Sequence, residues 1–335
     1  MNFPILSTLI FLPLISSFFI FLSKETKNNN SAIYISLFSS FATFILSLFI
    51  WHSLDLTSAD FQFLEEKSWI NDFIKFKLGV DGISILFIVL TTFITPICIL
   101  SCINSVKVRV KEFLIAILIL ETFMIGVFCS LDLVIFYLFF EAGLIPMFLI
   151  IGVWGGPRRE YAAIKFFLYT LLGSVLMLIA ILMLYFTSDV RLLSDEQLIA
   201  THVVQPSTAT QEITALRSAE SAVHTFNLMA LAAVGQLPNS PFAAVTVWLG
   251  MSLETWAFLL LLIGFVIKVP VFPVHTWLPD AHVEAPTPIS MILAGVLLKL
   301  GGYGILRICY PICPGAGLSL AWLVCGVGVV SMVYG

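Results

Sequence analysis

Long apolar runs are the feature of this sequence that most restricts its fold. About 18 or more consecutive apolar residues mark a helix that crosses a bilayer, because in lipid the backbone must satisfy its own hydrogen bonds. Only 11% of the 335 residues are charged, against about a quarter in soluble domains. We therefore predict an all-α polytopic membrane protein with about nine transmembrane helices, near residues 4–22, 32–51, 83–104, 113–129, 131–152, 163–186, 254–278, 287–308 and 317–335.

Basic residues are unevenly divided between the loops of this predicted bundle. Loops one, three and five carry Lys24, Lys27, Lys107, Arg109, Lys111, Arg158 and Arg159. The other loops carry Lys67, Lys75 and Lys77, diluted by Asp60, Glu65, Glu66 and Asp72. Since basic loops stay on the inner side of a membrane, we predict an outer N-terminus. The net charge of −4 includes no basic block, which argues against a nucleic-acid partner.

Two long polar segments interrupt the apolar pattern. We expect loop 52–82 to form an ordered cap outside the membrane. Loop 187–253 is rich in Ala, Thr, Ser and Gln, and its apolar patch, 226–234, is too short to span. It is either a tolerated surface insertion or the mark of a recombined gene. The last apolar run continues to Gly335, so we expect a truncated chain or one continued by a separate polypeptide.

The seventh predicted helix is broken. An apolar run ends at Lys268, and Pro270 and Pro273 follow, with His275 just beyond. Proline removes a backbone donor and clashes with the preceding turn, so both prolines predict a helix break. A break in lipid is tolerated only where protein or a water-filled cavity surrounds it. An ionisable residue beside such a break favours a transport function.

Glu141, Lys268 and Lys299 are ionisable residues that lie within predicted helices, away from the helix ends. Each opposes insertion by roughly 2.5–3.5 kcal/mol if it is unpaired. We expect Glu141 to face Lys268, and a lysine placed in this way can pass on a proton when its partner moves. His275, two helical turns from Lys268, is a candidate relay step. The alternatives are a static ion pair and a hydrogen-bonded core histidine.

Glu121 is a further carboxylate in the fourth predicted helix. It is either a lateral contact to a neighbouring subunit or an accessory part of the relay. No metal-ligand cluster, glycine-rich phosphate loop or haem motif is visible, and the six cysteines are interpreted as buried thiols. We therefore expect no metal and no redox cofactor in this chain.

Three stretches closely resemble one known family. They are KVPVFPVHTWLPDAHVEAPT at 268–287, LAGVLLKLGGYGILR at 293–307 and LDLVIFYLFFEAGLIPM at 131–147. All are similar to the chain M/subunit 4 family of antiporter-like subunits in proton-pumping NADH:quinone oxidoreductase, respiratory complex I. Multisubunit Na+/H+ antiporters share the glutamate and the lysines, but the string HTWLPDAHVEAP favours the respiratory member.

The resemblance implies a role for each matching residue. Glu141 is then the fifth-helix carboxylate, Lys268 the lysine of the broken helix, Lys299 the central lysine of the eighth helix, and His275 a bridge between them. It also implies that NADH, FMN, iron-sulfur clusters and quinone belong to partner subunits of complex I. The implied location is the mitochondrial inner membrane or the bacterial plasma membrane.

The same resemblance implies a division of the chain. The family has fourteen helices with two inverted five-helix repeats. Residues 1–112 would hold the first three helices, 113–308 the first repeat and 309–335 the start of the second. Helices ten to fourteen would be absent or supplied by a separate chain. We predict a proton-translocating subunit, with an antiporter subunit or a non-conducting scaffold as alternatives.

Overall fold

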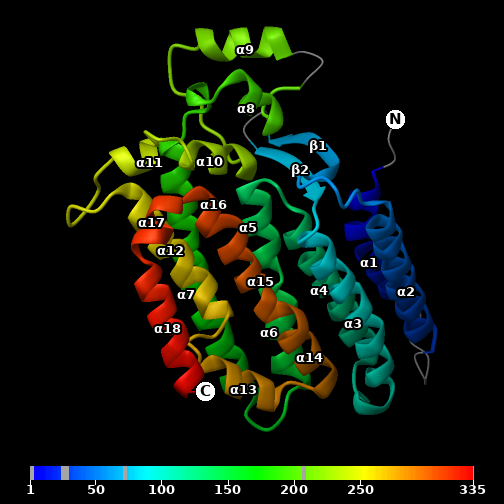
Figure 1. The fold of residues 1–335 in the computed structure, drawn as a ribbon. Coiled ribbons are helices and arrows are strands. Elements are labelled where there is room, and N and C mark those ends of the chain that lie inside the picture. Colours follow the sequence, from blue (N-terminus) through cyan, green and yellow to red (C-terminus); the bar gives the residue numbers. More distant parts are fainter. Residues whose placement is uncertain (1–3, 24–29, 71–73, 206–208, 335) are drawn as a thin grey trace.

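The computed structural model describes residues 4–23, 30–70, 74–205 and 209–334, and it shows a body of long helices with a cap at one end (Figure 1). The predictions on Lys24, Lys27 and Asp72 lie outside these residues. The first half contains α1 (Ile5–Leu22), α2 (Asn30–Ser53), β1 (Gln62–Ile70), β2 (Ile74–Val80), α3 (Ser84–Ser105), α4 (Val110–Cys129), α5 (Leu133–Ala142), α6 (Leu144–Trp154) and α7 (Arg159–Thr187).

The second half of the described chain alternates short and long helices. It contains a 3-10 turn (Val190–Leu192), α8 (Asp195–Ala200), α9 (Ala209–Ser218), α10 (Leu228–Gly235), α11 (Pro241–Ala244), α12 (Leu253–Lys268) and α13 (Trp277–Glu284). It continues with α14 (Thr287–Ile292), a π segment (Leu293–Leu297), α15 (Leu298–Gly304), a second π segment (Ile305–Cys309), α16 (Tyr310–Ile312), α17 (Pro314–Ser319) and α18 (Ala321–Tyr334).

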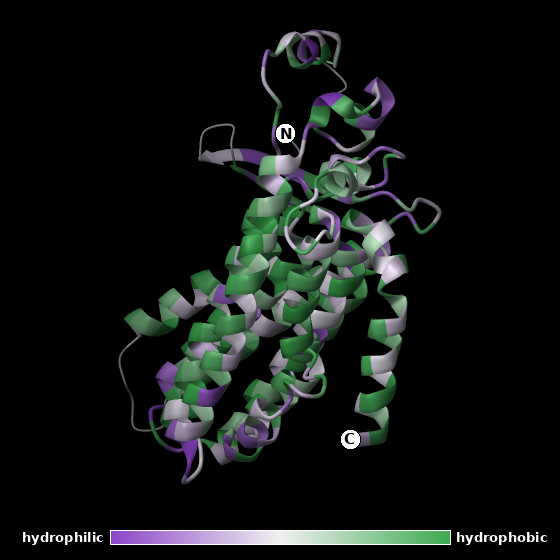
Figure 2. Ribbon diagram, turned by 90° about the vertical axis from the view of Figure 1, so that its left-hand side faces the viewer, coloured by the Kyte–Doolittle hydropathy of each residue, from purple (hydrophilic) through white to green (hydrophobic). Residues whose placement is uncertain are grey.

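The long helices match the predicted apolar runs. Within the described residues, seven helical stretches are long and apolar enough to cross a membrane. Figure 2 shows a body that is mostly hydrophobic, with hydrophilic residues concentrated at its two ends. The other two predicted spans are shorter helices, α12 with 16 residues and α18 with 14. The predicted run 317–335 is divided at Leu320, and α18 has no buried residue, so it lies at the edge of the body.

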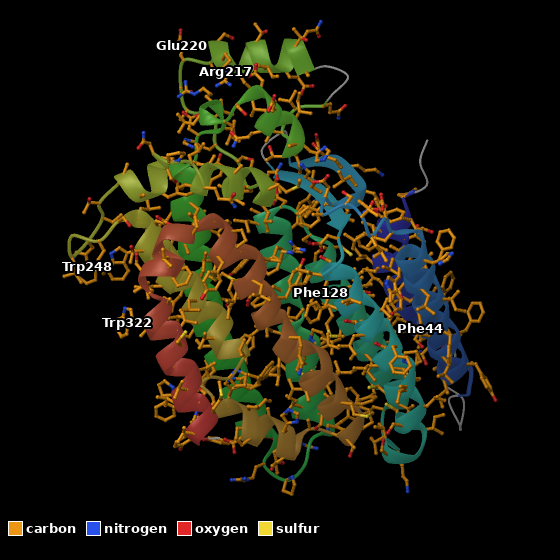
Figure 3. All side chains as sticks on the ribbon, in the orientation of Figure 1. Phe44, Phe128, Arg217, Glu220, Trp248 and Trp322 are labelled. Atoms are coloured by element: carbon orange, nitrogen blue, oxygen red, sulfur yellow. The ribbon has the colours of Figure 1, made fainter. Side chains whose placement is uncertain are left out.

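The fourth helix forms the centre of the N-terminal half. Most of α4 is buried, and it packs against α1, α2, α3, α5 and α6. Figure 3 places Phe128, near the end of α4, inside the body, whereas Trp248 and Trp322 lie at the periphery. Phe128 stacks on Phe87 of α3 at 5.2 Å between ring centroids. Apolar packing from several helices therefore surrounds every side of α4.

The expected cap over residues 52–82 contains a β-hairpin. Strands β1 and β2 pair antiparallel, with Glu65 opposite Leu78 and Lys67 opposite Phe76. Glu65 also accepts hydrogen bonds from the backbone N–H groups of Leu6 and Ser7, at 2.7 and 3.0 Å. A carboxylate at a helix N-terminus satisfies donors that the helix leaves unpaired. The hairpin thus holds the start of α1.

The segment 187–253 completes the cap. Its backbone pairs with the membrane body, because Leu133 donates to the carbonyl of Phe226 and Leu228 donates to that of Leu131, both at 2.9 Å. Gly235 lies directly against α16, where a Cβ atom would collide with the carbonyl oxygen of Ile312. These contacts join the segment to the helices beneath it. Its origin as an insertion or by recombination stays a prediction.

Candidate functional site

The seventh predicted helix is interrupted where the sequence indicated. Helix α12 ends at Lys268, two residues before Pro270, and α13 begins only at Trp277. The two-turn spacing would place His275 on the face of Lys268 only in a continuous, kinked helix. The chain instead leaves the helix between the two residues and turns at 269–276, so the two residues do not share a helix face. The cause is proline, which cannot continue the hydrogen-bond ladder.

Lys268 is buried at this helix end. Its side chain donates from Nζ to the carbonyl oxygen of Phe140 at 2.9 Å, and the ammonium lies 3.2 Å from the centroid of the Phe140 ring. A cation over an aromatic face is stabilised by the ring quadrupole. Phe265 meets the same ring edge to face, with centroids 5.6 Å apart. The ammonium is therefore held in an aromatic, water-poor setting with one carbonyl acceptor.

Glu141 lies next to the contact between Lys268 and Phe140, but its carboxylate takes no part in that contact. It is the residue after Phe140, and it stands near the end of α5, two residues before the interruption at Gly143. The expected Glu141–Lys268 ion pair is not formed among the described residues, and Glu141 Oε1 is buried with no hydrogen-bond partner. The reason is local: the ammonium is engaged by the main chain of the neighbouring residue instead of by the carboxylate.

Two close helix contacts fix this arrangement. A Cβ atom on Gly264 of α12 would lie 2.8 Å from the carbonyl oxygen of Gly173 in α7. A Cβ atom on Gly301 of α15 would lie 2.6 Å from the carbonyl oxygen of Phe265. Small residues let membrane helices approach this closely. Helix α12 therefore packs closely against α7 on one side and α15 on the other, just before Lys268.

Lys299 occupies a different environment from the one expected. It is exposed at the surface of the described chain, and its Nζ donates to the carbonyl oxygen of Ala294 at 2.7 Å. That carbonyl belongs to one of the two π segments on either side of α15, and such segments are frequent at functional sites. The structure does not bring Lys299 into contact with Lys268 or Glu141.

His275 lies in the turn between α12 and α13. Its ring packs against Phe272 and Tyr334, with centroids 5.8 and 5.3 Å away, and its Nδ1 is buried without a hydrogen-bond partner. The alternative of a hydrogen-bonded core histidine is therefore wrong for Nδ1. The described residues show no contact that links His275 to Lys268.

Glu121 is fully buried in α4. Both carboxyl oxygens lack a hydrogen-bond partner among the described residues, and the nearby hydroxyl of Thr95 donates to Thr91 instead. The interpretation of Glu121 as a lateral contact to a neighbouring subunit is wrong, because the side chain is 0% exposed inside the chain. Its membership of a proton relay remains a prediction.

The part of the chain that holds most of these residues is similar to a known protein family. A profile described as NADH:quinone oxidoreductase/Mrp antiporter, transmembrane, matches residues 130–335, which include Glu141, Lys268 and Lys299. The chain belongs to this antiporter-like membrane family. The described residues alone contain seven helices able to cross a bilayer, so the chain is a multi-pass membrane protein.

Relatives of this antiporter-like family extend along almost the whole chain. NADH-quinone oxidoreductase subunit M of Rickettsia prowazekii is 41% identical over 99% of this chain and 59% of its own length. Subunit M of Rhodobacter capsulatus is 42% identical over 98% and 58%. NADH-ubiquinone oxidoreductase chain 4 of Marchantia polymorpha is 41% identical over 98% and 57%. The chain thus spans about three fifths of the curated relatives it matches.

Solved structures share the fold. A chain of respiratory complex I from Thermus thermophilus superposes with a TM-score of 0.69 at 24% identity, over 95% of this chain and 55% of its own. A chain of the archaeal membrane-bound sulfane sulfur reductase superposes with a TM-score of 0.66 at 20% identity, over 92% of this chain and 41% of its own. Both comparisons show the antiporter-like fold.

The structure adds charged residues that the sequence analysis missed. Lys165 of α7 forms an ion pair with Asp280 of α13 at 2.8 Å, and Arg307 pairs with Asp81 above α3. Their sequence signal was a charge within a few residues of a predicted helix end. Such a position also permits simple exposure at the boundary, so the pattern alone was ambiguous.

The described residues of this chain contain no candidate metal site. No group of three or more His, Cys, Asp or Glu side chains gathers there in a way that could hold a metal ion. The expectation that no redox cofactor binds remains a prediction.

Proposed function

We propose that this chain forms part of a proton-translocating membrane subunit of a complex I-type NADH:quinone oxidoreductase. The observation that carries the proposal is the buried ammonium of Lys268 at an interrupted helix, held by one carbonyl beside Glu141, whose Oε1 is buried without a hydrogen-bond partner. Buried charges inside a membrane are costly, and buried charges with few hydrogen-bond partners are typical of ion pathways. The relatives named as subunit M and chain 4 agree with this function.

The proposed mechanism is electrostatic. A charge change in a neighbouring subunit moves the Glu141 carboxylate relative to Lys268, which raises or lowers the cost of keeping the ammonium protonated. Because the ammonium has one hydrogen-bond acceptor, it can release its proton without the loss of a network. The proton then passes along a hydrated line through His275 to Lys299, with Glu121 as an accessory group.

The remaining assignments follow from the same proposal. NADH oxidation and quinone reduction, with FMN and iron-sulfur clusters, take place in partner subunits. Residues 1–112 hold the first three helices, 113–308 the first repeat and 309–335 the start of the second. The exposed amino group of Lys299 would contact helices equivalent to the family's helices ten to fourteen. The rest of a longer chain, or a separate chain, would supply these helices. The other partners would be further membrane-arm subunits.

The decisive experiment replaces Glu141 by Gln in the assembled complex. The side chain keeps its size and loses its charge, so the coupling to Lys268 disappears. We expect NADH-driven proton uptake by inverted vesicles to fall roughly a hundredfold, the size of effect that a proton-transfer group contributes. Glu112→Gln, which removes an exposed carboxylate of α4, is the matched control and leaves uptake unchanged.

The alternatives give other results. A cation/proton antiporter subunit, which the family description also covers, would show sodium-dependent proton exchange without NADH. A non-conducting scaffold would show normal proton uptake per assembled complex, with Glu141→Gln affecting only the amount of complex on native gels. Either result would refute the proposed function.

A further inference from the structure

A cavity lined by both polar and apolar side chains lies at the end of the helix body opposite the cap. It has a volume of about 680 Å³ and is lined by the loops that follow α3 and α6, including Lys107, Arg109, Trp154 and Arg159. Helices α3 and α6 end at these loops, and α4 and α7 begin there. Since these helices are membrane spans, the cavity lies at the depth of the lipid headgroups.

The charges of the cavity are of one sign. Lys107, Arg109 and Arg159 are exposed, none forms an ion pair with a described residue, and no acidic residue lines the cavity. Neighbouring basic residues are engaged elsewhere. Arg158 lies 3.7 Å from Glu284, and Lys111 donates to the carbonyl oxygens of Phe21 and Ser23. Arg159 donates to the carbonyl oxygen of Val153 at 3.1 Å, whereas the side chains of Lys107 and Arg109 have no hydrogen bond or ion pair among the described residues, so two of the three cations are fully available.

The start of α4 adds a second observation. Arg109 precedes this 20-residue helix with a left-handed backbone, φ 51°, and no side chain caps the helix. A non-glycine residue in this region is strained, and such strain is commonest at functional sites. Uncapped backbone N–H groups at a helix N-terminus form an anion site, which phosphate suits well. Glu112, in the first turn, pairs with none of the three cations.

The walls of the cavity suit a lipid. The Trp154 indole donates to the carbonyl of Val108 at 2.8 Å and so holds the two loops together. Tryptophan is typical of the membrane interface. Ile103 and Val108 are exposed apolar side chains beside the cavity, at 47% and 69% exposure, and an acyl chain could lie against them.

We infer that this cavity binds the phosphate of an anionic phospholipid headgroup. The three cations neutralise the phosphate, the N-terminus of α4 supplies further donors, and the acyl chains run along α3. Zwitterionic lipids bind more weakly because their own ammonium group opposes the cations. The inference does not depend on the proposed proton path.

The test uses the purified complex in vesicles of phosphatidylcholine that contain spin-labelled phosphatidylglycerol. The double variant Lys107→Gln/Arg109→Gln should lower the affinity of the complex for the labelled phosphatidylglycerol about thirtyfold, as expected for the loss of two basic residues near the membrane surface. The control is Lys67→Gln/Arg217→Gln, which removes the same charge from the cap. Spin-labelled phosphatidylcholine should show no difference between the variants.

Each outcome decides the inference. A loss confined to the Lys107/Arg109 variant supports it, and failure of millimolar inorganic phosphate to displace the label identifies a lipid over free phosphate as the source. An equal loss in the control would show unspecific charge attraction and would overturn it. Unchanged lipid binding, with loss of a neighbouring subunit on native gels, would overturn it in favour of a protein contact.

Discussion

Two lysines of this protein are almost equally buried, and their surroundings differ. Lys77, in the β-hairpin of the cap, is 2% exposed, and Lys268, at the end of α12, is 4% exposed. Lys77 donates to the carbonyl oxygens of Thr201 and His202 at 3.2 and 2.9 Å and lies 3.7 Å from a carboxylate oxygen of Glu66. Lys268 has a single carbonyl and an aromatic ring.

This difference indicates a structural role for Lys77, whereas Lys268 is placed to take up and release a proton. The contacts of Lys77 join β2 to the segment 187–253, so its ammonium holds two parts of the cap together. Lys268 joins α12 to α5 through a single carbonyl, and Oε1 of the neighbouring Glu141 has no hydrogen-bond partner. A buried ammonium whose N–H groups all have acceptors resists a change in its protonation state. One with a single acceptor can change its protonation state when its surroundings shift slightly.

The largest expected effect is that of Lys268→Met. The variant removes the protonatable group, so NADH-driven proton uptake should fall roughly a hundredfold. Assembly should persist, because the replacement also removes an insertion cost of roughly 3 kcal/mol. Vesicle acidification and native gels measure the two properties. Loss of the complex together with the activity would mean that Lys268 is structural, like Lys77.

The reverse result is expected for Lys77→Met. The carboxylate of Glu66 and the Thr201 and His202 carbonyls lose their donor, which should destabilise the cap locally by about 1–3 kcal/mol. Hydrogen exchange should quicken in β2 and near residue 201, while proton uptake per assembled complex stays within about twofold. Lys75→Met, which removes a more exposed lysine bound to the same glutamate, is the control. Slower uptake without faster exchange would contradict the comparison.

The pH dependence of the cap should report the same lysine. Burial is the main cause that lowers the pKa of Lys77 from 10.5 to about 8, and Glu66 opposes it. Between these values the unfolded chain holds a proton that the folded chain has released, so this group makes the cap more stable as pH rises above about 8. Hydrogen exchange of β2 against pH should show the gain in the wild type and lack it in Lys77→Met. Equal slopes in both would refute the assignment.

The smallest effect is expected for Glu121→Gln. An ionised carboxylate without partners is too costly to bury, so the neutral carboxyl is the form that its surroundings tolerate. Glutamine preserves that shape, and proton uptake should change by less than about twofold. Stopped-flow measurement of vesicle acidification resolves such a change. A loss as large as that of Lys268→Met would place Glu121 in the main proton path.

The sequence by itself determined the membrane class, most helix positions and the break after Lys268. Each follows from local rules: lipid demands apolar runs that satisfy their own backbone, and proline ends a helix. It also indicated Glu141, Lys268 and Lys299 as charges that need an explanation, and a resemblance indicated the family.

Only the tertiary structure decided how these charges meet. The Phe140 carbonyl takes the ammonium of Lys268 in place of Glu141, Lys299 faces outward, and Lys165 reaches Asp280 in a distant part of the chain. Such pairings depend on how helices pack across more than a hundred residues, and small residues such as Gly173 and Gly264 set that packing. No local pattern contains this information, because the same periodicity is compatible with several rotations of each helix about its axis.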